Sequence, residues 1–310
     1  MLISIVNMIL PIFVTFMIGV GTRKLSLIDE SGCRTLKTLV SRIMLPVILV
    51  NAFMFADYSA NSVVIMVVFF IAMTLVLGIG FLLRRTLPDR ARYMPFVIAT
   101  IEGGTIGYPL AAMLYGTIGT SNMAVIDVGH TVFLFMIAVP VLQAVDGSKP
   151  DFKGILKNAI TSPTFDAMLL GILLGASGAG SFIAASPFGS TWEKLVSFLT
   201  APAGMLILIA LGYDLSIKKD LLKSVVCTSF MRVLVMGVLC ALSALVIFHF
   251  IPFEKEKLVI LILAFALPGS YAIPLFSEFP GHKDYVSTTI SFSTVLTFVI
   301  FTALTVYAFM

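Results

Sequence analysis

The chain has 310 residues, of which 59% are hydrophobic and 12% charged, and its formal net charge is +4. Soluble domains carry about 25% charged residues, so this chain has too few charges to cover a water-facing surface. Its apolar runs repeatedly reach the ~20 residues that span hydrocarbon as a helix. The composition therefore excludes a soluble protein and predicts an all-α integral membrane protein in a lipid bilayer. The three cysteines lack metal-ligand spacing, and the basic residues form no nucleic-acid surface, so we expect no metal and no nucleic-acid partner.

The hydrophobic pattern predicts ten transmembrane helices, joined in the middle by a polar cytoplasmic connector at residues 146–163. The connector separates a first group of five helices, residues 1–145, from a second group, residues 164–310. Because each group has an odd number of spans, the second enters the membrane from the opposite side and the repeat is inverted. The predicted helices lie at about residues 2–21, 35–56, 62–83, 93–116, 122–145, 164–184, 193–213, 222–250, 257–279 and 285–309.

The basic residues are distributed unevenly between the two sides of this arrangement. Fifteen of the 20 lysines and arginines fall in loops on one side and three on the other, while Arg42 and Arg232 lie within spans. Loops rich in lysine and arginine stay in the cytoplasm. We therefore expect a multi-pass protein of the cell (inner) membrane with both termini outside.

The fourth helix of each group contains a break. Residues 101–109 read I-E-G-G-T-I-G-Y-P, and residues 266–274 read A-L-P-G-S-Y-A-I-P. Glycine and proline weaken helix interiors, and such breaks are tolerated in a bilayer only where they are buried or line a watery cavity. Both breaks fall near the predicted midplane, so the second half-helices present N–H groups and partial positive charge there, a seat for a carboxylate. Merely kinked helices are the alternative.

These two breaks supply the candidate substrate-binding residues. We expect no catalytic residues, because the loops are too short for a soluble catalytic domain and no catalytic motif is present. The candidates are Glu102, Gly103, Gly104, Thr105, Tyr108, Pro109, Pro268, Gly269, Ser270, Tyr271 and Pro274.

Several motifs resemble the auxin efflux carrier family, which includes plant PIN-type carriers and bacterial malate or malonate permeases. The resemblance covers essentially the whole chain: N-M-I-L-P-I-F near the start, L-P-V-I-L-V in helix 2, A-P-A-G-M-L-I-L-I-A-L-G in helix 7 and A-L-P-G-S-Y-A-I-P-L-F-S-E-F in helix 9. It implies a fold related to bile-acid sodium symporters, with scaffold helices 1, 2, 6 and 7 and a mobile core of helices 3–5 and 8–10. Helices 4 and 9 then cross at the substrate, and elevator movement and a homodimer through the scaffold are implied.

Glu102 departs from the family's helix-4 pattern, N-x-G-x-x-G-x-P, in which Gly104, Gly107 and Pro109 match but asparagine stands at the glutamate's position. In the family that asparagine is implied to bind a substrate carboxylate. A glutamate would repel an anion unless it is protonated, and burial favours the protonated form. The alternative is that Glu102 caps backbone amides of the break and never meets substrate.

Other polar residues within spans have weaker claims. Asp127 and His130 share a face of helix 5 and with Glu102 form the candidate proton-coupling group, although a hydrogen-bonded structural pair explains them equally. Gly171 and Gly175 predict close helix packing. Trp192 is expected at the outer interface, and residues 152–160 as an interfacial helix.

The sequence thus predicts a secondary transporter, not an enzyme, that moves a small organic anion such as malate or malonate. We expect no cofactor beyond a coupling ion, H⁺ through Glu102 or Na⁺. The alternatives are a carrier of the same fold for a cationic or zwitterionic amine or a sodium-coupled substrate, and a sensor that binds without transport.

Overall fold

The computed structural model describes residues 2–56, 59–86, 92–147, 154, 157, 163–215, 219–271, 273 and 283–309. Within these ranges the regular structure is helical. The long helices are α1 (Leu2–Lys24), α4 (Ala60–Leu83), α6 (Tyr108–Phe133), α13 (Leu222–Phe250) and α15 (Lys283–Phe309). The shorter ones are α2 (Glu30–Leu39), α3 (Leu45–Met54), α5 (Met94–Ala99), α7 (Val139–Val145), α9 (Pro163–Ala176), α10 (Ala179–Ala185), α11 (Gly189–Thr200), α12 (Ala203–Asp214) and α14 (Lys255–Ala266).

Six helical segments among the described residues are long and apolar enough to cross a membrane, or seven if the bent pair α9 and α10 is one span. Their outward faces suit hydrocarbon. On α4, for example, Val63, Val67, Ile71 and Leu75 follow one another at helical spacing and are about half exposed. Such an apolar stripe would be a liability in water and is expected against lipid. The fold is therefore that of a helical multi-pass membrane protein, whereas the predicted ten-helix inverted repeat is not established by these spans.

The predicted loop between helices 4 and 5 is shorter than expected. One candidate span of 52 residues, Met94–Val145, covers nearly all of both predicted helices and includes the break after α5. Its backbone turns at Tyr115 and at Gly116, where φ is +56° and ψ is −132°, a conformation that glycine adopts without steric cost. The helix predicted to end at Gly116 does end at this turn, but residues 117–121, predicted as a loop, are already helical.

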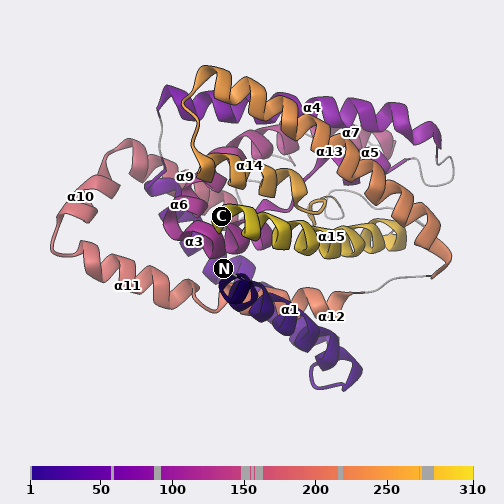
Figure 1. The fold of residues 1–310 in the computed structure, drawn as a ribbon, viewed down its shortest axis with the longest axis horizontal. Coiled ribbons are helices and arrows are strands. Elements are labelled where there is room, and N and C mark those ends of the chain that lie inside the picture. The colour runs from indigo at the N-terminus through magenta and orange to yellow at the C-terminus, as the bar shows by residue number, and fades with distance from the viewer. Residues whose placement is uncertain are drawn as a thin grey trace.

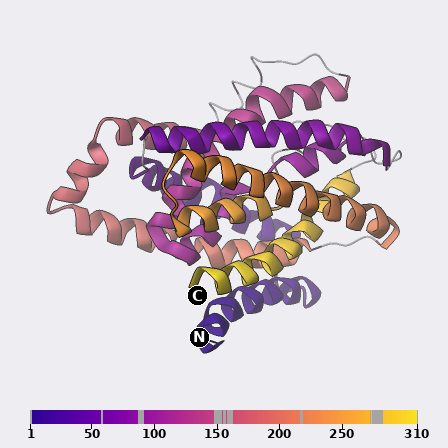
Figure 2. The ribbon, with the colours of Figure 1, turned by 45° about the horizontal axis from the view of Figure 1, so that its top comes forward.

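Two other predicted spans each consist of two helices. The sixth, expected at residues 164–184, consists of α9 and α10, which meet at an angle of 71° beside Gly178, where φ is +77°. In the seventh, expected at residues 193–213, the chain turns at Ala201 and Pro202 between α11 and α12. In Figures 1 and 2, α10 and α11 extend away from the rest of the molecule.

Three wide, π-helical turns have one cause in common. The turns Val40–Met44, Gly103–Gly107 and Leu134–Ala138 each end two residues before a proline, at Pro46, Pro109 and Pro140 respectively. Proline has no backbone N–H, and its ring clashes with the carbonyl one turn earlier, so the helix widens before it. The two turns at Pro46 and Pro140 leave the helices continuous, whereas the glycine-rich turn before Pro109 follows a complete break.

The helices pack in two groups. In one, α1 packs against α12, and α3 packs against α9 and α11. In the other, α4 packs against α5, α6 and α13, while α14 packs against α6, α13 and α15. Contacts of α3 with α6 and of α1 with α15 join the groups, and α1 begins beside the end of α15 in both views (Figures 1 and 2). The predicted division into scaffold helices and a mobile core stays a prediction.

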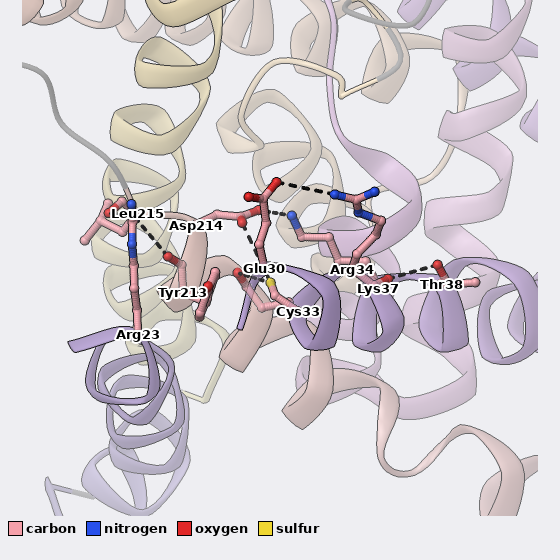
Figure 3. A network of polar contacts seen from close by, with 10 residues as sticks. Arg23, Glu30, Cys33, Arg34, Lys37, Thr38, Tyr213, Asp214 and Leu215 are labelled. Atoms are coloured by element: carbon pink, nitrogen blue, oxygen red, sulfur yellow. Dashed lines mark hydrogen bonds and ion pairs between the residues drawn. The ribbon is translucent and has the colours of Figure 1, made fainter. Parts of the chain in front are cut away.

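Polar contacts fix the ends of α1, α2 and α12 to one another (Figure 3). Arg23 donates to the carbonyl oxygens of Tyr213 and Leu215, at 3.2 and 3.3 Å, which cap the end of α12. Lys37 on α2 forms an ion pair with Asp214, whose other oxygen lies 3.8 Å from the thiol of Cys33. Because Lys37 and Asp214 are each about a third exposed, water weakens this pair, and the network orients these ends more than it stabilises them.

Trp192, predicted at the outer interface, donates its indole N–H to Oδ1 of Asn51 on α3 at 2.9 Å. This bond joins α11 to α3.

Asn51→Leu is expected to lower the free energy of unfolding by about 1 kcal/mol, the usual net value of a hydrogen bond. Because the chain has one tryptophan, its fluorescence emission should also move to shorter wavelength as the indole loses its polar partner. Asn61→Leu at an exposed position is the control, and equal emission from the two variants would contradict the contact.

Candidate functional site

The two predicted breaks meet in space. After α5 the backbone is extended at Thr100, and after α14 it is extended at Leu267. The N–H of Glu102 donates to the carbonyl of Pro268 at 2.9 Å, and the N–H of Ser270 donates to Oγ1 of Thr100 at 3.1 Å. Two interrupted helices therefore cross as paired extended segments, so backbone groups that the breaks leave free find partners in the opposite segment.

The Glu102 carboxylate binds both segments at once. One oxygen accepts from the N–H and hydroxyl of Thr105, at 3.2 and 2.8 Å. The other accepts from the N–H of Tyr271 at 2.9 Å and lies 3.4 Å from the hydroxyl of Ser270. Glu102 is 8% exposed, and no basic side chain lies within ion-pair distance of it among the described residues.

This geometry matches the capping role considered for Glu102. Glu102 is the N-terminal cap of the turn that leads into α6, a position where a carboxylate satisfies N–H groups and complements the helix dipole. The seat that we predicted for a substrate carboxylate is thus occupied by the chain's own carboxylate. Whether Glu102 also contacts substrate stays a prediction.

The glycines of the first break allow neighbouring groups to come close. A Cβ on Gly103 would lie 2.9 Å from a carboxylate oxygen of Asp127, and one on Gly107 would lie 2.8 Å from the side chain of Leu267. Gly107 therefore brings the second segment against the first, and Gly103 brings Asp127 against the break.

Asp127 and His130 are both at the break, on α6. His130 is buried, and its Nε2 accepts from the N–H of Ile101 at 3.2 Å. Its Nδ1 lies 3.6 Å from Asp127, whose other oxygen accepts from the hydroxyl of Tyr108 at 3.1 Å. An Nε2 that accepts a hydrogen bond carries no proton, so this contact holds the neutral imidazole with its proton on Nδ1, facing the carboxylate.

The remaining predicted residues lie around the crossing, with one exception. Pro109 lies in the first turn of α6, and Gly104 faces the side chain of Leu45. A Cβ on Gly269 would lie 2.8 Å from the carbonyl of Val97, so the two backbones touch there. Pro274 lies outside the described residues, as does almost all of the predicted interfacial helix at residues 152–160.

One residue of the crossing was missed at the sequence level. Arg232, on α13, donates to the carbonyls of Val97, Ile98 and Leu267. The signal was present, because an arginine inside an apolar span is a functional hypothesis by default. We had counted it only as a basic residue within a span.

Comparison with known proteins finds a relative that aligns with almost the whole chain. The chain is 26% identical over 299 residues to a protein of Methanothermobacter thermautotrophicus described as an uncharacterized transporter, and the alignment covers 94% of each chain. No family model matches the chain. This similarity points to transporters in general and does not reach the auxin efflux carrier family.

Proposed function

We propose that this chain is a secondary transporter that binds its substrate at the crossing of the two broken helices. The main support for this proposal is the crossing itself, where two interrupted helices place polar backbone and hydroxyl groups inside an apolar helical protein. Paired discontinuous helices of this kind form substrate sites in transporters. The relative reported above is named as a transporter and aligns with almost the whole chain, which supports the same conclusion.

The substrate that best fits the donors is a small organic anion, a mono- or dicarboxylate of the malate or malonate class. The N–H groups of Thr105 and Tyr271 and the hydroxyls of Thr105 and Ser270 already hold one carboxylate, that of Glu102. A substrate carboxylate would take these donors over. Glu102, displaced from these donors, is the group that we propose carries the coupled proton. Substrate and proton would move together, with Asp127 and His130 as further candidates for the proton path.

Movement by an elevator-type mechanism fits the two packing groups. The group of α4, α5, α6, α13, α14 and α15 contains the whole crossing and would move as one body. The group of α1, α3, α9, α11 and α12 would form the fixed scaffold and the homodimer contact. We place this assembly in the cell membrane with both termini outside.

A second candidate substrate is a cationic or zwitterionic amine, or a substrate coupled to sodium. The observation that favours it is the Glu102 carboxylate, which is buried without a basic partner among the described side chains. If Glu102 stays ionised, it would attract an ammonium group or Na⁺ rather than an anion. A sensor that binds substrate at the crossing without moving it differs from both by the lack of flux.

Reconstituted liposomes test these proposals. We expect uptake of labelled malate, malonate or a related acid that is driven by an imposed inward proton gradient and is unaffected by sodium. Uptake of amines but not acids would favour the second candidate. Binding with no flux of either class under proton or sodium gradients would indicate a sensor and would contradict a transporter.

A further inference from the structure

Arg232 lies on the apolar helix α13 and is buried, with 3% of its surface exposed. Its Nη1 donates to the carbonyl of Val97 at 2.7 Å and to that of Ile98, and its Nη2 donates to the carbonyl of Leu267. One guanidinium therefore joins two segments that are far apart in the chain and belong to the two breaks.

These three carbonyls need a partner because of their place in the helices. Val97 and Ile98 lie in the last turn of α5, and Leu267 directly follows α14. The last carbonyls of a helix have no backbone N–H partner within the helix, and they carry partial negative charge. In hydrocarbon there is no water to donate to them instead. The guanidinium presents several N–H groups in one plane with a fixed positive charge, so it serves both helix ends together.

The opposite side of the crossing has the opposite charge. There the Glu102 carboxylate accepts from the N–H of Thr105, in the turn that leads into α6, and from the N–H of Tyr271. Among the described residues, Arg232 forms no ion pair with a carboxylate. The cation is thus balanced by the carbonyl ends of two helices, and the anion by backbone N–H groups of both crossing segments.

The first helix of the crossing cannot hold this arrangement alone. α5 has six residues, far fewer than an isolated helix needs to be stable. The end of α14 has a second support, because the hydroxyl of Thr297 on α15 donates to the carbonyl of Ala266 at 2.6 Å. Among the described side chains, Arg232 donates hydrogen bonds to the ends of both α5 and α14.

We propose that Arg232 is the positioning residue of the crossing: it holds the carbonyl ends of α5 and α14 together and so fixes where Glu102 and the neighbouring N–H groups stand. Its effect on transport rests on the proposed function, whereas its effect on the crossing does not.

Hydrogen–deuterium exchange of the full-length protein in nanodiscs tests the proposal without substrate. In Arg232→Gln, amides at both crossing segments, residues 100–105 and 268–271, should exchange roughly tenfold faster or more, because the helix ends that precede both segments lose their charge-assisted hydrogen bonds. Arg232→Lys, which keeps the charge but not the fork, should give a smaller rise at both. The control Thr297→Val removes a cap from α14 alone and should affect mainly residues 268–271.

Each outcome is decisive. Unchanged exchange at either segment in Arg232→Gln, or an equal rise throughout α4 and α13, would overturn the proposal, since the latter indicates general unfolding. If Arg232→Gln is not recovered, Arg232→Lys carries the same test. Where the wild type transports an acid in liposomes, Arg232→Lys should raise KM more than it lowers kcat, while an unchanged KM would contradict positioning. If the wild type transports none, the proposed function fails and the exchange result still judges Arg232.

Discussion

Replacing Glu102 by alanine is expected to destabilise the protein by about 2–6 kcal/mol, because the N–H groups of Thr105 and Tyr271 both lose their acceptor and a buried unpaired donor costs about 1–3 kcal/mol. The loss arises at the crossing, where the carboxylate also bonds two hydroxyls. It should appear as a lower melting temperature in detergent and as loss of uptake in liposomes.

A matched control tests whether the loss of stability is specific to Glu102 or follows from the loss of any glutamate. Glu193 is exposed on α11, so Glu193→Ala should change stability by less than about 0.5 kcal/mol and leave uptake intact. Equal melting temperatures for the two alanine variants would show that the Glu102 contacts contribute nothing to stability.

Glu102→Gln distinguishes capping from proton coupling. Glutamine keeps the shape, but its amide nitrogen cannot accept from an N–H group, so one of the two segments loses its partner. If Glu102 carries the coupled proton, this variant should bind substrate with an affinity that no longer depends on pH and should not concentrate it under a proton gradient. Uptake and pH dependence equal to those of the wild type would exclude the proton role.

Much of the helix pattern was predictable because long apolar runs have few alternatives in a membrane. α13 has the predicted bounds, Leu222–Phe250, and α15 begins two residues earlier than predicted. The breaks were predictable for the same reason, since glycine and proline interrupt such runs visibly. α2 instead begins at Glu30, five residues before the prediction, because Asp29 caps it by accepting from the N–H of Gly32 at 2.6 Å. Its charged residues had suggested a loop.

The contacts of the crossing were less accessible, because they join residues far apart in the chain. Sequence could place the two breaks at similar depth but could not show that Glu102 reaches Tyr271. It predicted positive helix ends without showing that the chain supplies the anion itself. Sequence also could not show that Gly178, with its positive φ, lies in the bend between α9 and α10. The Gly171 prediction fared better, since a Cβ there would lie 2.7 Å from Phe53 on α3.

A second large effect is expected where α1 crosses α12 at two glycines. A Cβ on Gly19 would lie 2.2 Å from the carbonyl oxygen of Ile209, and one on Gly212 would lie 2.1 Å from that of Phe16. Small residues of this kind let helix backbones approach closely in membranes. Gly19→Ala must therefore push the helices apart, at a cost of about 1–3 kcal/mol or more.

Gly21 on the same helix is the control, because a Cβ there would meet nothing within 4 Å. Gly21→Ala should leave stability unchanged or raise it by up to about 1 kcal/mol through the better helix propensity of alanine. Melting temperatures in detergent should therefore fall for Gly19→Ala alone. Because α1 and α12 belong to the proposed scaffold and the substrate site to the other group, Gly19→Ala should lower stability without changing KM for transport. A changed KM with unchanged stability would contradict a fixed scaffold and place this helix pair in the moving part of the protein.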